Sequence, residues 1–172
     1  MSQQRLLQLA PPPAAPVKTG NSNDWDAVEQ NLGSKFPRDY KWFIGTYGGC
    51  AFFDFLQVLS PFGERISLIE RHRQRAEAIG ALQEQFPVFP KEGGLLLCAG
   101  DENGNSLFWM TKGAPDSWEL VYYADDYLEF VHYPIGLVEF LAGFVAGEYS
   151  PHFITGVPFR NRGEPIVTSC SA

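Results

Sequence analysis

Oxygen-bearing side chains in the segment DENGN, which begins at Asp101, have the types and spacing of a cation-binding loop. An EF-hand loop starting there needs oxygen ligands at its first, third and fifth positions, glycine at the sixth and a bidentate glutamate at the twelfth. Asp101, Asn103 and Asn105 satisfy the three oxygen positions, but Ser106 and Lys112 occupy the sixth and the twelfth. Because a lysine stands where the metal needs its strongest anionic ligand, the EF-hand interpretation fails.

The same segment predicts a β-hairpin. An Asn-Gly dipeptide at 103–104 lies between two apolar runs, and Asn-Gly tolerates the positive φ angles of a type I′ turn, whose twist matches that of the flanking strands. A two-residue turn there would pair Leu97 with Met110 and Cys98 with Trp109. We therefore expect a structural hairpin rather than a ligand site.

The common motifs of enzymes that use serine, nucleotides or zinc are absent from the sequence: it has no GxSxG, GxxxxGK, GxGxxG or HExxH. His72, His132 and His152 stand far apart, and none has a second histidine or cysteine at metal-ligand spacing. The three cysteines are odd in number and lack CxxC spacing, as expected of reduced thiols in a cytoplasm. We expect no catalytic residue, metal or cofactor, with Cys98 meeting a distant histidine as the alternative.

One stretch carries most of the negative charge. Residues 101–130 hold seven acidic side chains and one lysine, against a formal charge of −7 for the whole chain. Aromatic residues are interleaved with these acids: Trp109, Trp118, Tyr122, Tyr123 and Tyr127. Turns at one end of a sheet would gather several acids, and aromatic anchors beside an acidic rim suit recognition of a basic protein surface. The candidate partner-binding residues are Asp101, Glu102, Asp116, Glu119, Asp125, Asp126, Glu129 and Tyr127.

Other interpretations of the acidic residues, and of a group of basic residues, stay open. The acids could be ordinary solubility charge at loop tips, with the aromatic residues in the core. A helical pattern at 65–82 carries Arg71, Arg73 and Arg75 on its expected solvent side. These arginines could form a solvated helix face, or a site for a phosphate or an acidic partner.

Local patterns predict helices and strands that would position these residues. Helices are expected where apolar residues recur at helical spacing beside capping residues: 25–33, ending at Gly33, and 37–47, with Pro37 first and Gly48 after it. The almost wholly apolar stretch 134–147 predicts a buried helix. Strands are expected at 51–59 and 118–124, with 127–133 as an edge strand or an irregular return. Strands mixed with segregated helices indicate the α+β class.

Composition bounds the domain organisation. A chain of 172 residues with 45% hydrophobic content favours one domain. We expect that domain at 24–149, between a flexible proline-rich tail at 1–23 and an irregular tail at 150–172. A pI near 4.9 disfavours binding to nucleic acid or anionic membranes. No apolar run is long enough to span a bilayer and the first residues make a weak secretory signal, so we expect a cytoplasmic protein.

Four stretches in this order resemble the SUKH superfamily, which includes cell-wall-assembly regulator-like proteins and many bacterial immunity proteins. The stretches are WDAVEQNLG (25–33), FPRDYKWFIGTYGG (36–49), LQVLSP (56–61) and GLLLCAGDENGNSLFW (94–109), the last followed by PDSW (115–118). The resemblance runs from about Trp25 to Gly147. It implies a non-enzymatic α+β domain with a twisted, largely antiparallel sheet and flanking helices.

The resemblance also implies a function. Many such domains neutralise a polymorphic toxin, frequently a nuclease, made by the same or neighbouring cells. A nuclease attracts polyanions, so fixed carboxylates would steer an inhibitor to it. The leading hypothesis is a cytoplasmic immunity protein that binds a cognate, basic toxin. The alternatives are a regulatory scaffold without a toxin and an unrecognised enzyme or ligand-binding domain.

Overall fold

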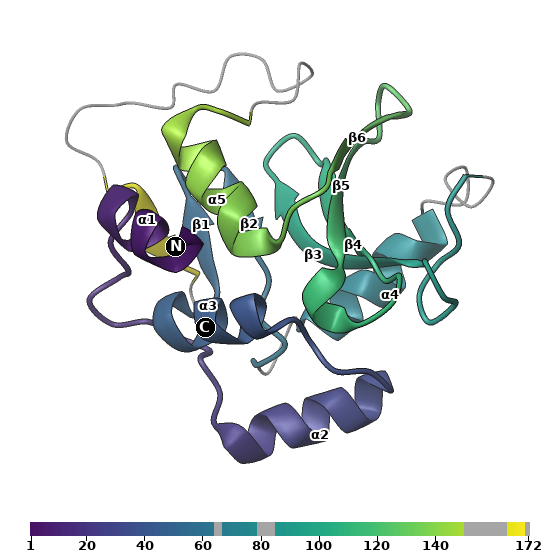
Figure 1. Ribbon diagram of the computed structural model, residues 1–172, viewed down its shortest axis with the longest axis horizontal. Helices are drawn as coiled ribbons and strands as arrows, with labels where there is room; N and C mark the ends of the chain where they lie inside the picture. Colours follow the sequence, from purple (N-terminus) through teal and green to yellow (C-terminus); the bar gives the residue numbers. More distant parts are fainter. Residues whose placement is uncertain (64–66, 79–84, 150–164, 171–172) are drawn as a thin grey trace.

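The computed structural model describes residues 1–63, 67–78, 85–149 and 165–170 (Figure 1). The helices are α1 (Ser2–Leu9), α2 (Ser22–Leu32), α3 (Arg38–Tyr47), α4 (Leu68–Ala78), the 3-10 helix η2 (Pro115–Ser117) and α5 (Leu137–Ala146). The strands are β1 (Cys50–Phe52), β2 (Leu56–Val58), β3 (Leu95–Asp101), β4 (Ser106–Met110), β5 (Glu119–Ala124), β6 (Glu129–Tyr133) and β7 (Val167–Ser169). Within these residues the strands form one seven-stranded antiparallel sheet in the order β6-β5-β4-β3-β2-β1-β7. The predicted α+β class with flanking helices is confirmed.

Helices α3 and α5 cover one face of the sheet. Successive side chains of a strand point to opposite faces, so Trp109 and Leu107 share a face, and Leu107 lies opposite Tyr122 on the neighbouring strand. The ring of Tyr40 in α3 lies 4.8 Å from that of Trp109. The ring of Phe140 in α5 lies 6.3 Å from that of Tyr122. Large, fully buried aromatic rings therefore join the helices to the centre of the sheet.

Helix α4 packs on the opposite face. The backbone N–H of Leu97 in β3 donates to Nδ1 of His72 at 3.4 Å. Arg75 donates through Nε to the hydroxyl of Ser106 at 2.9 Å, and Ser106 alternates with the residues that face α3 and α5. None of the helices in the described part of the chain has the length and apolar character that crossing a bilayer requires.

The first two predicted helices begin and end close to where the sequence places them. Asn21 caps α2 in a reciprocal capping box with Asp24, and Gly33 ends the helix in the left-handed conformation. Pro37, predicted as the first residue of α3, is instead its N-cap, and Gly48 ends the helix as predicted. The buried helix predicted at 134–147 is α5. Of the two alternatives left open for 127–133, the structure has the edge strand, β6.

The single strand expected at 51–59 is wrong. The segment forms two short strands, β1 and β2, that pair with each other, with Phe52 opposite Leu56. Phe53 and Asp54 make the turn with φ angles of 56° and 51°, which residues with a side chain seldom adopt. The turn escaped prediction because residues 51–59 are apolar apart from Asp54 and Gln57 and include no glycine or proline.

The flexible tail expected at 1–23 is also wrong. Residues 2–9 form α1, which packs on α5. Leu6 and Ala10 are fully buried and Leu9 packs against the same core, so the apolar residues follow helical i, i+3, i+4 spacing. The hydroxyl of Tyr47 donates to the carbonyl oxygen of Ala10 at 2.8 Å.

Part of the irregular tail expected at 150–172 forms a strand. Residues 167–169 are β7, which pairs with β1 at one edge of the sheet. The N–H of Phe53 donates to the carbonyl oxygen of Ile166 at 2.7 Å. The remainder of this expectation, at 150–164, lies outside the described residues.

Gly48 allows the N-terminal segment to approach α3 closely. Its φ is 70° and its ψ is −159°, a combination open in practice to glycine alone. A Cβ at this position would lie 2.0 Å from the carbonyl oxygen of Val17. That oxygen accepts a hydrogen bond from the N–H of Gly49 at 3.0 Å. The glycine pair after α3 therefore forms the contact surface for the segment that follows α1.

We expect Gly48→Ala to lower the free energy of unfolding by about 2–4 kcal/mol, because the new Cβ meets backbone and the positive φ strains it. Urea denaturation measures the loss, and amide hydrogen exchange at Val17 and Gly49 should increase. The matched control is Gly45→Ala in the same helix, where a Cβ meets nothing within 4 Å. That control should stabilise the protein by about 0.5–1 kcal/mol. Equal effects of the two substitutions would contradict the proposed contact.

Glu29 joins α2 to the start of α3. Its buried carboxylate accepts hydrogen bonds from Lys35 Nζ at 2.7 Å, from Lys41 Nζ at 2.6 Å and from the N–H of Phe36 at 3.0 Å. Burial alone would raise the pKa of Glu29, but these three hydrogen bonds together outweigh it and hold the pKa below its ordinary value of 4.5. The carboxylate is therefore ionised and stabilising at neutral pH.

Glu29→Gln should lower the free energy of unfolding by about 2 kcal/mol at pH 7, since two lysines lose their anionic partner. A lowered pKa in the folded state means that the wild-type advantage is complete above pH 4.5 and is lost as pH falls through the folded-state pKa. Urea denaturation of both proteins at pH 7 and pH 3 measures this difference. A gap between the two proteins that stays constant across this range would rule out the ionic contribution.

Candidate functional site

Two hairpin tips lie at the same end of the sheet. The β3–β4 loop at 102–105 and the β5–β6 loop at 125–128 are adjacent because Ser106 at the start of β4 lies opposite Tyr123 near the end of β5. Arg75 of α4 bridges the two tips: Nη1 lies 3.2 Å from the Asp125 carboxylate and Nη2 donates to the carbonyl oxygen of Gly104 at 3.3 Å. We call Glu102 together with residues 125–130 the tip surface.

The predicted partner-binding residues divide between the two ends of the sheet. Most of them lie at the two tips: Asp101, Glu102, Asp125, Asp126, Tyr127 and Glu129. Asp116 and Glu119 lie at the opposite end, in the β4–β5 connection and at the start of β5. Asp116 accepts hydrogen bonds from the N–H and Nε of Arg38, and Glu119 lies 2.7 Å from Nε2 of His132. The structure therefore separates these two acids from the others.

Asp101 is committed to the structure of its own hairpin. Its carboxylate accepts from the N–H groups of Asn103 and Asn105 and from Nδ2 of Asn105, each at 2.9 Å. The hydroxyl of Tyr122 donates to the same carboxylate at 2.6 Å. Burial, with Asp101 nearby, raises the pKa of Tyr122, which therefore keeps its proton as a donor. With four donors satisfied, Asp101 organises the tip rather than presenting a free charge.

This hydrogen bonding corrects the predicted hairpin register. Leu95 lies opposite Met110 and Leu96 opposite Trp109, two residues earlier in β3 than the Asn-Gly turn implied. Asp101 and Asn105 close a three-residue loop that ends at Gly104 with φ of 84°, the pattern of a type I turn followed by a left-handed residue. A bulge between Leu97 and Ala99 accounts for the remaining shift.

The β5–β6 tip exposes apolar and acidic side chains together. Tyr127 is 63% exposed, Leu128 66% and Phe130 39%. Asp126 and Glu129 are exposed on the same tip. Leu128 has a φ of 53°, which holds this apolar residue in a conformation that side chains seldom adopt. Apolar side chains next to carboxylates have the composition of a protein-binding surface.

The aromatic residues interleaved with the acids are mostly core residues. Trp109, Trp118, Tyr122 and Tyr123 are buried, so Tyr127 alone among the five predicted aromatic anchors is exposed. The structure adds Leu128 and Phe130, which the sequence analysis did not select. Their exposure could have been predicted from the position of Leu128 inside a turn and of Phe130 on an edge strand.

The two buried cysteines of the core are poor nucleophiles. Burial raises the pKa of the thiols of Cys50 and Cys98, and a protonated thiol is a weak nucleophile. Burial lowers the pKa of His72. No group of three or more His, Cys, Asp or Glu side chains suited to a metal ion occurs in the part of the chain that the structure describes.

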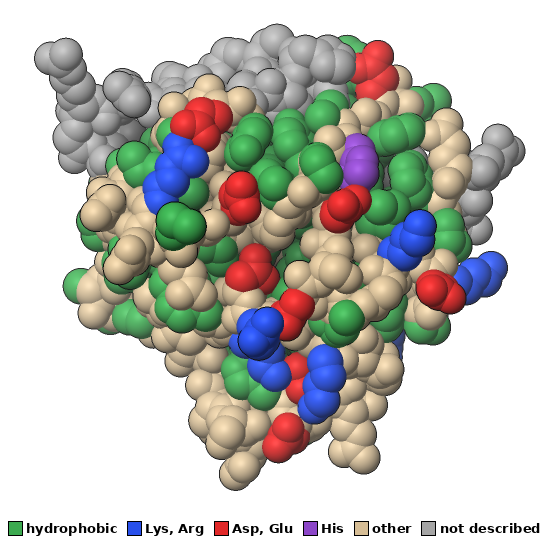
Figure 2. All heavy atoms as spheres, viewed as in Figure 1, with side chains coloured by type: hydrophobic (Ala, Val, Ile, Leu, Met, Phe, Trp, Pro, Cys, Tyr) green, Lys and Arg blue, Asp and Glu red, His purple; other side chains and the backbone are tan. Residues whose placement is uncertain are grey.

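The surface charges are dispersed. On the face seen in Figure 2, Asp and Glu side chains lie in ones and twos among hydrophobic and basic side chains, without a continuous acidic field. The β5–β6 tip is a candidate surface because of its exposed apolar side chains, Tyr127, Leu128 and Phe130, rather than because of an acidic field.

A comparison with known families agrees with this architecture. The sequence model of the SUKH_6 family, described as SMI1-KNR4 cell-wall, matches residues 22–141. The chain belongs to this family. The SUKH resemblance inferred from the sequence is thereby confirmed, and SUKH domains are generally non-enzymatic immunity or regulatory domains. The match leaves out α1 and β7, which the structure packs into the same fold.

The chain is also similar to a prophage protein. It is 25% identical over 132 residues to the SPbeta prophage-derived uncharacterized protein YokK of Bacillus subtilis (strain 168), covering 60% of this chain and 69% of that protein. No solved structure matches the chain significantly.

Asp101→Ala should lower the free energy of unfolding by about 2–3 kcal/mol, because it leaves the Tyr122 hydroxyl and the loop N–H groups without their acceptor. Hydrogen exchange at Asn103 and Asn105 should accelerate as well. Asp126→Ala on the neighbouring tip is the control, and it should change stability by less than about 0.5 kcal/mol. Chemical denaturation of both variants measures the difference. A neutral Asp101→Ala would show that the turn does not depend on the carboxylate.

Proposed function

We propose that this protein is an immunity protein that neutralises a cognate protein toxin by direct binding, with the tip surface at the interface. The toxin is a basic protein, for example a nuclease. The observation that carries the proposal is the exposure of Tyr127, Leu128 and Phe130 beside Asp126 and Glu129 on one hairpin.

The physical case rests on the two kinds of side chain at this tip. Burial of the apolar side chains against a partner would supply affinity, because aromatic and aliphatic groups at the centre of an interface contribute most of the binding energy. The carboxylates would speed the approach of a basic partner and disfavour acidic ones. A nuclease fits both demands, since its surface is built to attract a polyanion.

Family membership supports a protein partner over a small substrate, because SUKH domains generally act in immunity or regulation. It also supports a second candidate function. The family description refers to cell-wall proteins, which favours a regulatory scaffold that binds cellular partners and has no toxin. Under that alternative the tip surface would bind several cellular partners, and none of them would be a toxin that this protein inhibits.

Affinity capture with the tagged protein, at low salt and again at high salt, separates the two functions. Recovery of one basic protein, whose toxicity disappears when both are produced in the same cells, would support immunity. Recovery of several non-toxic partners would support the scaffold. Stoichiometric loss of the toxin's activity on mixing the purified proteins would then establish inhibition by binding.

Asp126→Lys should slow association with the captured toxin about tenfold at low salt, and the effect should shrink at high salt as the charges are screened. Surface plasmon resonance at two ionic strengths measures the association rate. Asp26→Lys makes the same charge change at an exposed position on α2, away from both tips (Figure 1). If both variants slowed association equally, overall charge rather than the tip surface would be responsible.

A further inference from the structure

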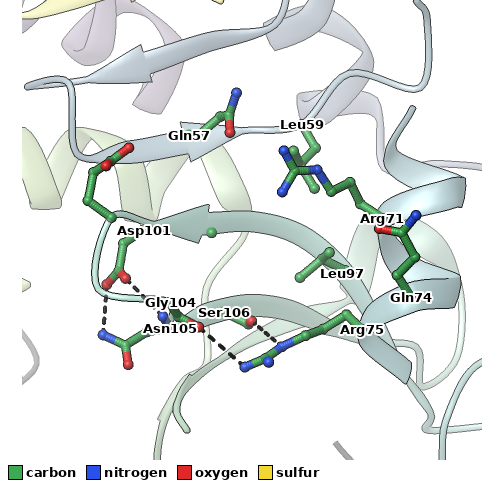
Figure 3. A pocket seen from close by; sticks show the side chains of 12 residues that line it. Gln57, Leu59, Arg71, Gln74, Arg75, Leu97, Asp101, Gly104, Asn105 and Ser106 are labelled. Atoms are coloured by element: carbon green, nitrogen blue, oxygen red, sulfur yellow. Dashed lines mark hydrogen bonds between the residues drawn. The ribbon is translucent and has the colours of Figure 1, made fainter. Parts of the chain in front are cut away.

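A cavity lies between α4 and the face of the sheet that carries Ser106. Its volume is about 370 Å³, within the range of sites that hold a small molecule or an inserted side chain. Gln57 of β2, Leu97 and Gly100 of β3, and Arg71 of α4 line it (Figure 3). Because Gly100 has no side chain, the middle of the sheet leaves room in front of α4.

Arg71 and Arg75 lie one helical turn apart and differ in how they are used. Arg75 makes hydrogen bonds to Ser106 and Gly104 and an ion pair with Asp125, so each of its three guanidinium nitrogens has a partner and the group forms a wall of the cavity. Arg71 extends its guanidinium into the cavity beside Leu59 (Figure 3). No carboxylate among the described residues lies within ion-pair distance of it. A guanidinium offers five donors in a planar fork that matches a carboxylate.

The acids of the cavity do not neutralise Arg71. Asp101 accepts four hydrogen bonds, three from its own hairpin and one from the Tyr122 hydroxyl. Glu102 lines the cavity with an exposed carboxylate, which repels an incoming anion and attracts a cation. Glu102 should therefore weaken the binding of a simple carboxylate and strengthen the binding of a zwitterion, and this difference can be measured.

We propose that this cavity binds a carboxylate through Arg71, and that the carboxylate is an aspartate or glutamate side chain of the protein partner. The source of the carboxylate rests on the proposed function; the chemistry of the cavity does not. Arg71, Gln74, Glu102 and Gly104 are exposed at its rim. A free metabolite is usually held with most of its surface buried, whereas a side chain on a protruding partner loop needs only an open mouth.

The cavity is placed to act together with the tip surface. Arg75 forms its wall and at the same time holds Asp125 of the β5–β6 tip. A partner seated on the tips therefore lies next to the cavity mouth. An acidic residue inserted there, within an otherwise basic partner surface, would fix the register of the complex and exclude partners that lack it.

The test uses the full-length protein and Nα-acetyl-glutamate N-methylamide, which mimics a glutamate within a chain, with the corresponding glutamine compound as its neutral match. NMR titration should give saturable shifts of the amide signals of Leu97, Gly100 and Ser106. The dissociation constant of the glutamate compound should be roughly 1–10 mM, as expected for a ligand of this size. The glutamine compound should bind at least tenfold more weakly.

Substitutions locate the site. Arg71→Gln should weaken binding of the glutamate compound at least tenfold. Arg73→Gln on the same helix should leave binding unchanged, because Arg73 is exposed, lies near Glu70 and does not line the cavity. Glu102→Gln should tighten binding two- to fivefold by removing the repelling charge. Thermal melts of each variant report whether the fold is retained.

Several outcomes would overturn the proposal. Equal binding of the glutamate and glutamine compounds, or unchanged binding to Arg71→Gln, would exclude carboxylate recognition by Arg71. Tenfold tighter binding of free succinate or glutamate would assign the site to a metabolite, and tenfold tighter binding of inorganic phosphate would assign it to a phosphate. Weaker binding to Glu102→Gln would indicate a zwitterion. These measurements need no toxin, so failure of the immunity function and failure of the cavity are distinguished.

Discussion

The carboxylate of Asp101 determines how the centre of the sheet is arranged. By accepting from two N–H groups of its own loop, it stabilises the three-residue β3–β4 loop and sets which residues of β4 lie opposite β3. That register directs Ser106 towards α4, where Arg75 bonds to it. Arg75 in turn joins the two hairpin tips. The position of α4, the shape of the cavity and the spacing of the tips all depend on this one turn.

Local signals in the sequence were sufficient for α2, α3 and α5, although α1 was missed. Capping side chains, the glycines after α2 and α3, and helical spacing of apolar residues act within a few residues, so the chain itself displays them. The strand hairpins were harder. The turn at Phe53 and Asp54 has no glycine or proline. At the β3–β4 hairpin, the Asp101 side chain stabilises a three-residue loop in place of the expected two-residue turn. Both depend on bonds that only the folded chain supplies.

The acidic residues show more clearly that sequence patterns do not reveal contacts between distant residues. Sequence grouped seven carboxylates by proximity along the chain, yet antiparallel connections send alternate loops to opposite ends of a sheet. Asp116 and Glu119 therefore lie at the end of the sheet opposite the tips, where they contact Arg38 and His132. Arg38 lies 78 residues from its partner and Arg75 lies 50 residues from Asp125. Ion pairs of such separation leave no pattern that a reader of the sequence can recognise.

Charges that the fold uses internally are poor candidates for recognition. Asp101 accepts bonds within its own hairpin and Asp125 accepts one from Arg75 of α4, and removing these carboxylates from water for a partner would add a cost without a new bond. Exposed residues of the β5–β6 tip are better candidates: Asp126 for steering and Leu128 for contact. A strong frame with an exposed tip lets such residues change without disturbing the sheet. Specificity can therefore diverge among relatives that share one fold.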